Sequence, residues 1–387
     1  MRRGLQGTLE AIPGGGERIR AFVPAPLPPR VPLELGGARQ RLLERATLAL
    51  GRLDSISILL PDSDLFLYSY VRREAVLSSQ IEGTQSSLSD LLLFELEGAP
   101  GAPVDDVVEV SNYVAALDHG VARLRGGFPL SSRLLCEIHA ALLSRGRGSD
   151  RAPGEFRRSQ NWIGGTRPGN AHYVPPPPHR VGECMSALEK FLHADPPAYP
   201  ALVQAGLAHV QFESIHPFLD GNGRIGRLLI ALLLHQGGAL SQPLLYLSLY
   251  LKQHRAEYYR LLDLARAEGD WEAWLDFFLE GVEQVSESAV HAARRLVALF
   301  EEDAARARSL GRGAASAQRV LTALRARPLL SLGEAVRRTG VAFPTAAKGM
   351  AALAGLGIAR ELTGRRRNRV FVYDRYLAVL NEGAEPL

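Results

Sequence analysis

A run of twelve residues at positions 216–227 gathers groups that act together on phosphate esters. It reads His-Pro-Phe-Leu-Asp-Gly-Asn-Gly-Arg-Ile-Gly-Arg. His216 is a candidate general base for an incoming hydroxyl group, and the carboxylate of Asp220 is a ligand type that Mg²⁺ takes together with phosphates. Gly221 and Gly223 permit a tight turn into a helix, whose unpaired N–H groups and positive dipole end favour an anion. The run therefore predicts an anion-binding loop with a base beside it.

Two arginines complete the run. Arg224 and Arg227 are three residues apart and share one face of a helix, where their forked guanidinium groups fit polyphosphate oxygens. Base, metal ligand, phosphate cradle and cation pair together predict attack of a hydroxyl on a nucleotide phosphate. A P-loop would need Gly-Lys-Ser/Thr after the glycines, and an EF-hand would need acidic residues where Phe218 and Leu229 stand. A plain interhelical turn is the remaining alternative, although it would need neither the histidine nor the arginines.

This run resembles the signature of the Fic protein family, HPFxDGNGRxxR, at every fixed position. The resemblance extends over roughly residues 10–300. PGEFR and NWIGG, at 153–157 and 161–165, resemble the flap that precedes the motif, and HRAEYYRLL at 254–262 resembles the helix that follows. Residues 72–95 resemble the N-terminal helical segment of the long Fic subclass. The fold implied is a mainly α Fic helical core with a β-hairpin flap.

The resemblance implies transfer of AMP from ATP to a Tyr, Thr or Ser hydroxyl of a protein, with the chain itself as one target. His216 would deprotonate the hydroxyl, and Asp220 would hold Mg²⁺ against the phosphates. The flap would pair with the target peptide as an added strand. The remaining residues implied at the nucleotide or target are the cradle Gly221, Asn222 (with its side chain) and Gly223, the helix residues Arg224, Ile225, Gly226 and Arg227, the flap residues Asn161, Trp162, Ile163 and Gly164, and the adenine-pocket residues Tyr258 and Tyr259.

A second motif implies regulation. Ser78-Ser79-Gln80-Ile81-Glu82-Gly83 fits the Fic inhibitory pattern [ST]xxxE[GN]. Ser78 and Glu82 lie four residues apart on one helix face, and Gly83 is a natural helix terminator. The resemblance implies that Glu82 pairs with Arg227 and so displaces ATP from its productive position. A helix end with a solvated glutamate is the plainer interpretation, and the same glutamate could instead position a water for AMP removal.

The surrounding sequence indicates the elements that must position these residues. Helical periodicity runs over 39–97, 107–124 and 131–143, and it resumes from 180 to about 304. The Gly-, Pro- and Asn-rich stretch 150–180 indicates a β-hairpin or an ordered loop, and 1–38 reads as an extended arm. We expect an N-terminal helical region with the inhibitory motif, a Fic catalytic domain with flanking helices and a C-terminal module, at 1–105, 106–305 and 306–387.

The C-terminal module has three short helical segments followed by an alternating pattern with Gly364 at its turn, which predicts a winged helix-turn-helix. Four arginines within 365–369 would suit DNA phosphates. Thr345 and Lys348 are the only polar readers on the second helix, which is poor for base readout. The alternatives are therefore a DNA-binding regulator with a Fic nucleotide sensor, or a module for protein recognition or homodimer formation.

Length and composition exclude other classes of protein. The chain has 387 residues, 46% hydrophobic and 22% charged, as in globular proteins of two or three domains. Its net charge of +4 is too small to demand a polyanionic partner. Cys136 and Cys184 exclude a disulfide framework or multi-cysteine zinc site. We find no signal peptide, and polar residues and Pro243 interrupt the apolar window 228–251, so we expect a cytoplasmic protein without a membrane span.

Overall fold

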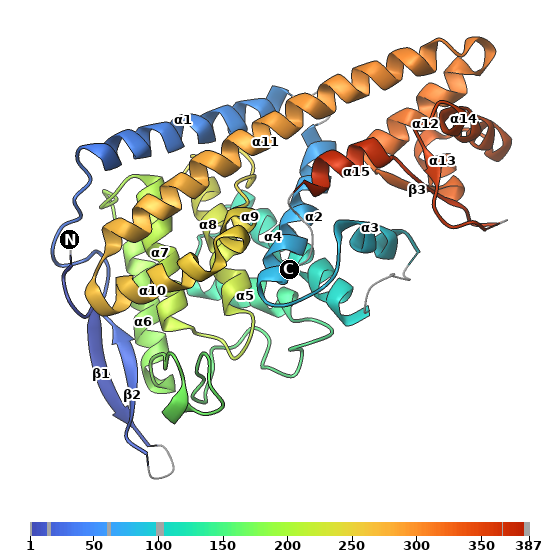
Figure 1. Ribbon diagram of the computed structural model, residues 1–387. Coiled ribbons are helices and arrows are strands. Elements are labelled where there is room, and N and C mark those ends of the chain that lie inside the picture. Colours follow the sequence, from blue (N-terminus) through green and yellow to red (C-terminus); the bar gives the residue numbers. More distant parts are fainter. Residues whose placement is uncertain (1, 14–16, 60–62, 98–103, 366, 383–387) are drawn as a thin grey trace.

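The computed structural model describes residues 2–13, 17–59, 63–97, 104–365 and 367–382. Within these residues the protein is mainly α-helical, as expected, with fifteen α-helices and two small antiparallel sheets (Figure 1). One large hydrophobic core continues from the N-terminal helices through the central helices into the C-terminal segment. In the same residues no helix combines the length and apolarity needed to cross a membrane.

The N-terminal segment is more regular than the extended arm that its prolines and glycines suggested. β1 (Gly7–Ile12) and β2 (Ile19–Pro24) form an antiparallel hairpin, which projects beside α6 and α7 in Figure 1. Ala21, Phe22 and Val23 are buried on β2. Because β2 has apolar residues to bury, the hairpin packs onto the central helices.

The central helices form the part of the fold that carries the motif. α7 is buried along nearly its whole length, and it packs beside α8, whose buried residues continue from Asn222 to Leu234. Such helices without a polar face lie inside a domain and not on its surface. The helices preceding and following the motif are α1 (Ala38–Leu59), α2 (Ser63–Ile81), α3 (Leu88–Glu97), α4 (Val104–Arg125), α5 (Ser132–Leu142), α6 (Pro178–Leu192), α7 (Ala201–Ile215), α8 (Asn222–Gln236), α9 (Ser248–Gln253), α10 (Arg255–Glu268) and α11 (Trp271–Arg308).

The flap is shorter than the β-hairpin that the sequence predicted. It is an ordered loop closed by a single antiparallel bridge between Ile163 and Tyr173, with a 3-10 turn at Pro168–Asn170. Gly164 and Gly165 both have φ of 69°, which interrupts extended pairing after the bridge. On its other side, Val174 accepts a hydrogen bond from the backbone N–H of Phe22, so β2 supports the flap.

The C-terminal module contains, within its described residues, four α-helices and a three-stranded antiparallel sheet in the order β3-β5-β4. The helical segments and the final hairpin are therefore present, whereas the winged-helix identity of the module stays a prediction. α11, the longest helix, runs alongside α1 and leads into this module (Figure 1). The elements of the C-terminal module are α12 (Ala314–Ala326), β3 (Leu329–Ser331), α13 (Leu332–Thr339), α14 (Phe343–Gly355), β4 (Arg360–Glu361), β5 (Val370–Val372) and α15 (Asp374–Asn381).

The module also contacts α2. The guanidinium groups of Arg72 and Arg327 lie on the ring of Tyr68, with their central carbons 3.5 and 3.6 Å from its centroid. The hydroxyl groups of Ser69 and Tyr376 are 3.0 Å apart. α2 is thus held by the C-terminal module near Tyr68, while its other end leads to Glu82 at the motif.

Candidate active site

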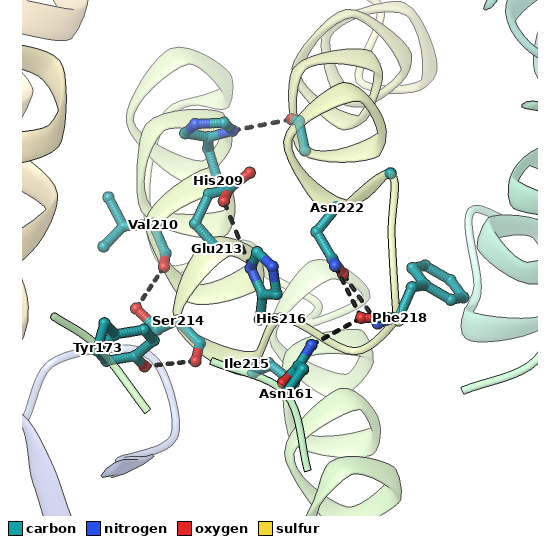
Figure 2. A network of polar contacts seen from close by, with 12 residues as sticks. Asn161, Tyr173, His209, Val210, Glu213, Ser214, Ile215, His216, Phe218 and Asn222 are labelled. Carbon is teal, nitrogen blue, oxygen red and sulfur yellow. Dashed lines mark hydrogen bonds and ion pairs between the residues drawn. The ribbon is translucent and has the colours of Figure 1, made fainter. Parts of the chain in front are cut away.

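The loop between α7 and α8 is held in shape by its own side chains (Figure 2). The amide of Asn222 accepts a hydrogen bond from the N–H of Phe218 (2.9 Å) and donates one to the Phe218 carbonyl (2.8 Å). Gly221 has φ of 77° and precedes the first residue of α8. The Asn222 side chain was expected to contact the α-phosphate, but the structure uses both ends of its amide to close the loop.

His139, on α5, is a supporting residue that the sequence did not single out. Its ring stacks on Phe218 with centroids 3.8 Å apart, and its Nε2 lies 3.0 Å from the carbonyl oxygen of Asp220. Its Nδ1 accepts a hydrogen bond from the N–H of Gly154 (2.9 Å), which leaves Nε2 to carry the proton. Burial lowers the pKa of His139 to about 4, so a neutral ring fixes the loop.

His216 ends α7 in the left-handed conformation, with φ of 49°. Such a conformation is strained for a non-glycine residue and directs the side chain away from the helix path. Arg157, from the PGEFR segment, donates a hydrogen bond from Nε to the His216 carbonyl (2.9 Å). The backbone N–H of Arg157 donates to the Pro217 carbonyl. Burial, assisted by the nearby Arg157, lowers the pKa of His216 to about 3. The imidazole is therefore neutral at pH 7 and able to accept a proton.

Asp220 has a donor set that suits a cation shared with phosphates. One carboxylate oxygen accepts the N–H of Gly221 (2.6 Å) and lies 3.5 Å from Nη2 of Arg224, and the side chain is 33% exposed. Across the described ranges, no group of three or more His, Cys, Asp or Glu side chains could hold a metal. A single accessible carboxylate fits Mg²⁺, which typically binds one or two carboxylates and completes its shell with phosphates and water.

Arg227 and Glu82 are in direct contact, the contact that the inhibitory motif implied. Nη2 of Arg227 is 2.7 Å from a Glu82 carboxylate oxygen and 3.0 Å from the Ser78 carbonyl, and Nε donates to Oγ of Ser78 (2.8 Å). Burial alone would raise the pKa of Glu82, but Arg227 outweighs it and lowers the pKa. A Cβ on Gly223 would be 2.4 Å from that Glu82 oxygen, so the carboxylate covers the start of α8.

Arg224 has a different partner, which the sequence did not indicate. Its Nη1 lies 2.7 Å from a carboxylate oxygen of Glu109, on α4, and both side chains are 3% exposed. Burial raises the pKa of Glu109 even though Arg224 opposes that shift. The two arginines predicted to face the phosphates together are thus each paired with a buried or half-buried carboxylate in this state.

The flap residues lie beside the loop. Asn161 donates from its side chain to the Phe218 carbonyl (2.9 Å), which ties the flap to the motif. Trp162 is 38% exposed, Ile163 forms the bridge to Tyr173, and Gly164 follows at the turn. The backbone at this bridge is therefore adjacent to the motif, as an added target strand would require.

The two tyrosines expected at the adenine have unlike surroundings. Tyr258 is 1% exposed, and its hydroxyl lies 2.8 Å from Nε2 of His209 in the core. Tyr259 is 39% exposed, and its ring centroid lies 5.0 Å from that of Tyr258. Of the remaining motif residues, Ile225 is fully buried, and the carbonyl of Gly226 lies 2.9 Å from Nδ1 of His209. Of this pair, only Tyr259 has an exposed side chain.

Two stretches of the chain match models of known protein families. Residues 40–122 match the Fic/DOC family N-terminal domain, and residues 129–234 match the Fic/DOC family domain. Relatives named protein adenylyltransferase Fic include those of Drosophila ananassae, 31% identical over 207 residues, and Culex quinquefasciatus, 33% identical over 209 residues. Each alignment covers 53% of this chain and 38% of the relative, so the chain spans about two fifths of the length of these relatives.

Solved structures show the same fold. A Fic family protein from Desulfovibrio desulfuricans G20 superposes with a TM-score of 0.58 at 21% identity, over 89% of this chain and 98% of the other. A Fic domain-containing signalling protein from Bacteroides thetaiotaomicron gives a TM-score of 0.51 at 19% identity, over 65% of this chain and 97% of the other. The arrangement of helices around the motif is therefore one already seen in Fic proteins.

Proposed function

The chain carries the N-terminal and central domains of the Fic/DOC family, and from this we propose that it transfers AMP from ATP to a Tyr, Thr or Ser hydroxyl of a protein. The observation that carries the proposal is the neutral, half-buried His216 next to a loop where Asp220 and the start of α8 meet. A base, a carboxylate and an anion-binding helix end are the groups that this reaction needs.

The base acts on the attacking hydroxyl. His216 takes the proton of the target hydroxyl while the hydroxyl oxygen forms a bond to the α-phosphorus of ATP. The bond from that phosphorus to the bridging oxygen breaks, and pyrophosphate leaves. Because the pKa of His216 lies near 3 in this state, the ring begins the reaction unprotonated at pH 7. Its basicity must rise as the transferred proton gains a stabilising neighbour.

The rest of the loop holds the nucleotide. The first N–H groups of α8, from Asn222 onward, have no partner within the helix and suit the α-phosphate. Asp220 would hold Mg²⁺, which when bound neutralises phosphate charge. Tyr259 offers its exposed ring to the adenine. The backbone of Ile163 is already bonded to His172 and Tyr173, so the flap residues on either side of it, Trp162 and Gly164, pair with the target as an added strand.

We further propose that Glu82 inhibits this reaction. Arg227 would bind the outer phosphates of ATP. Its contacts with Glu82 and Ser78 support a state in which its guanidinium group is not available to those phosphates. The carboxylate also lies close above Gly223, where a phosphate would approach the helix. A negatively charged phosphate and the Glu82 carboxylate would repel one another, so ATP binds productively only after Glu82 has moved.

The partners follow from the chemistry of the proposal. Targets present an exposed hydroxyl on an extended segment, and the chain itself is one of them. We propose that the reaction occurs in the cytoplasm. A homodimer, and DNA as a partner of the C-terminal module, stay predictions that need their own binding measurements.

The test uses purified wild type, Glu82→Gly and His216→Ala, each incubated with Mg²⁺ and ATP labelled at the α-phosphate. We expect weak labelling of the wild type, stronger labelling of Glu82→Gly, and none of His216→Ala. Intact mass identifies the transferred group as AMP, and ATP labelled at the γ-phosphate should leave no label. Equal labelling of all three proteins, or label from the γ-phosphate alone, would overturn the proposal.

A further inference from the structure

Within the described residues, two buried polar atoms near the base make no hydrogen bond of normal geometry. They are Nδ1 of His216 and Oε1 of Glu213, one turn earlier on α7. The second oxygen of the same carboxylate lies 3.9 Å from Nδ1 (Figure 2). The Glu213 side chain is 8% exposed and that of His216 is 18% exposed. A carboxylate therefore sits against the inner nitrogen of the base, about 1 Å beyond hydrogen-bond distance.

Within the described residues, the Glu213 carboxylate forms no ion pair with a lysine or an arginine. Glu213 faces the seam between α7 and α8, where a Cβ on Gly226 would be 2.5 Å from Oε1. Burial raises the pKa of Glu213 to about 7, and the charged groups that act on it are Arg227 and Arg266, which lower the pKa, and Glu82, which raises it. Arg227 is engaged by Ser78 and Glu82. Burying a carboxylate without a full set of partners is unfavourable to folding.

The position of Glu213 suits the needs of a general base. A histidine accepts a proton on one nitrogen only when the other nitrogen carries the ring proton. A carboxylate next to Nδ1 selects that tautomer and stabilises the imidazolium that forms, as in other His–carboxylate pairs. Catalytic hydrogen bonds are often long before the substrate binds and shorten in the reacting complex.

We propose that Glu213 is the positioning residue of His216. In the reacting complex its carboxylate accepts the Nδ1–H of His216, and Nε2 takes the proton from the target hydroxyl. In the ionised form of Glu213, which is the form able to accept Nδ1–H, the proton taken by Nε2 stays on the imidazolium while the hydroxyl oxygen gains the bond to phosphorus and pyrophosphate departs. This inference rests on the proposed AMP transfer, and it assigns the group that raises the basicity of the histidine during the reaction.

The first test measures turnover in the Glu82→Gly background. Glu213→Gln should lower kcat for AMP transfer by about 10²-fold, the size typical of an impaired general base. The KM for ATP should change by less than about twofold because Glu213 is not placed at the nucleotide. The acidic limb of the kcat/KM pH profile should also shift. The matched control is Glu257→Gln, an exposed residue paired with Arg260 on α10, which should behave as the parent.

The second test needs no turnover and keeps the inference separate from the proposed activity. ¹⁵N NMR of the histidine rings in the full-length chain reports which nitrogen of His216 is protonated. We expect the Nδ1–H tautomer in the parent and a shift toward Nε2–H in Glu213→Gln, whose amide can donate to Nδ1. If the parent labels no target, the proposed function fails, and the NMR still decides the pairing. An unchanged tautomer, or a kcat within twofold of the parent, would overturn the role of Glu213.

Discussion

Replacing Glu82 by glycine should make the protein less stable and more active at once. The substitution removes the carboxylate 2.7 Å from Nη2 of Arg227, whose side chain is 2% exposed. Breaking a buried ion pair by removing one partner typically costs 3–5 kcal/mol. Ser78 keeps two hydrogen bonds to the guanidinium, and the Glu82 side chain is itself 34% exposed. Both facts reduce the loss of unfolding free energy, which we expect to be about 2 kcal/mol.

The same interaction sets the degree of inhibition. Arg227 must leave Glu82 before it can bind the outer phosphates. If the state with Arg227 released is about 2 kcal/mol less stable than the paired state, roughly 3% of the molecules are in it. Removing the carboxylate makes that state dominant. The rate of AMP transfer at subsaturating ATP should therefore rise by about 30-fold in Glu82→Gly. Glu82→Gln keeps an acceptor for Arg227 but loses the charge, so its rate of AMP transfer should lie between those of the wild type and Glu82→Gly.

The assay combines two measurements on the same preparations. Initial rates of α-phosphate incorporation are measured for wild type, Glu82→Gly and Glu82→Gln, with Glu257→Gln as the exposed control. Thermal unfolding is followed without nucleotide. The ion-pair explanation is refuted if Glu82→Gly is as stable as the wild type while its rate rises, because the carboxylate would then inhibit without being bound to Arg227. A variant that is destabilised but no more active would refute the inhibition itself.

The remaining predictions concern the loop and a buried acid. Asn222→Ala removes both hydrogen bonds that close the loop at Phe218, so thermal unfolding should show a loss of about 2–3 kcal/mol and labelling should fall to background. Gly223→Ala places a Cβ 2.4 Å from the Glu82 carboxylate. In a double-mutant cycle with Glu82→Gly, the loss of unfolding free energy in the double variant should be smaller than the sum of the two single losses by about 1 kcal/mol. Additive losses would contradict the contact. Burial raises the pKa of Glu74 from 4.5 to about 7, so the folded state keeps a proton that the unfolded chain releases, and stability falls as pH rises between these values. Urea unfolding at pH 5 and pH 8 should show a fall in wild type that exceeds the fall in Glu74→Gln by at most about 3 kcal/mol, because Glu213, whose pKa burial also raises to about 7, contributes in both proteins.

The candidate residues that the sequence indicated are those that lie in short recognisable runs. His216, Asp220 and Arg227 lie within twelve consecutive residues, and Glu82 was assigned through a second short motif. The helical character of the chain also followed from periodicity. Roles that depend on this local spacing can be inferred from the sequence because the helix and its entry loop determine where those side chains lie.

The supporting residues could not be found in the same way. Glu109 and His139 approach the motif from α4 and α5. They lie 115 and 81 residues before the motif residues that they contact, Arg224 and Asp220, and no spacing marks them. Arg157 was visible within PGEFR, but its bonds to the backbone at His216 depend on how the flap folds. The shortness of the flap is likewise a tertiary result, because the glycines after Ile163 end the pairing.

The contacts between the C-terminal module and α2 connect the module to the contact between Glu82 and Arg227, because both involve α2 or the residues that follow it. Tyr68, held between Arg72 and Arg327, is fourteen residues from Glu82, or about 21 Å at the helical rise. A stiff helix held at one end and paired at the other transmits a shift of either end to its opposite end. Thermodynamic linkage then acts in both directions. Any molecule that binds the module more tightly when α2 is displaced would favour ATP, and ATP would strengthen the binding of that molecule by the same factor.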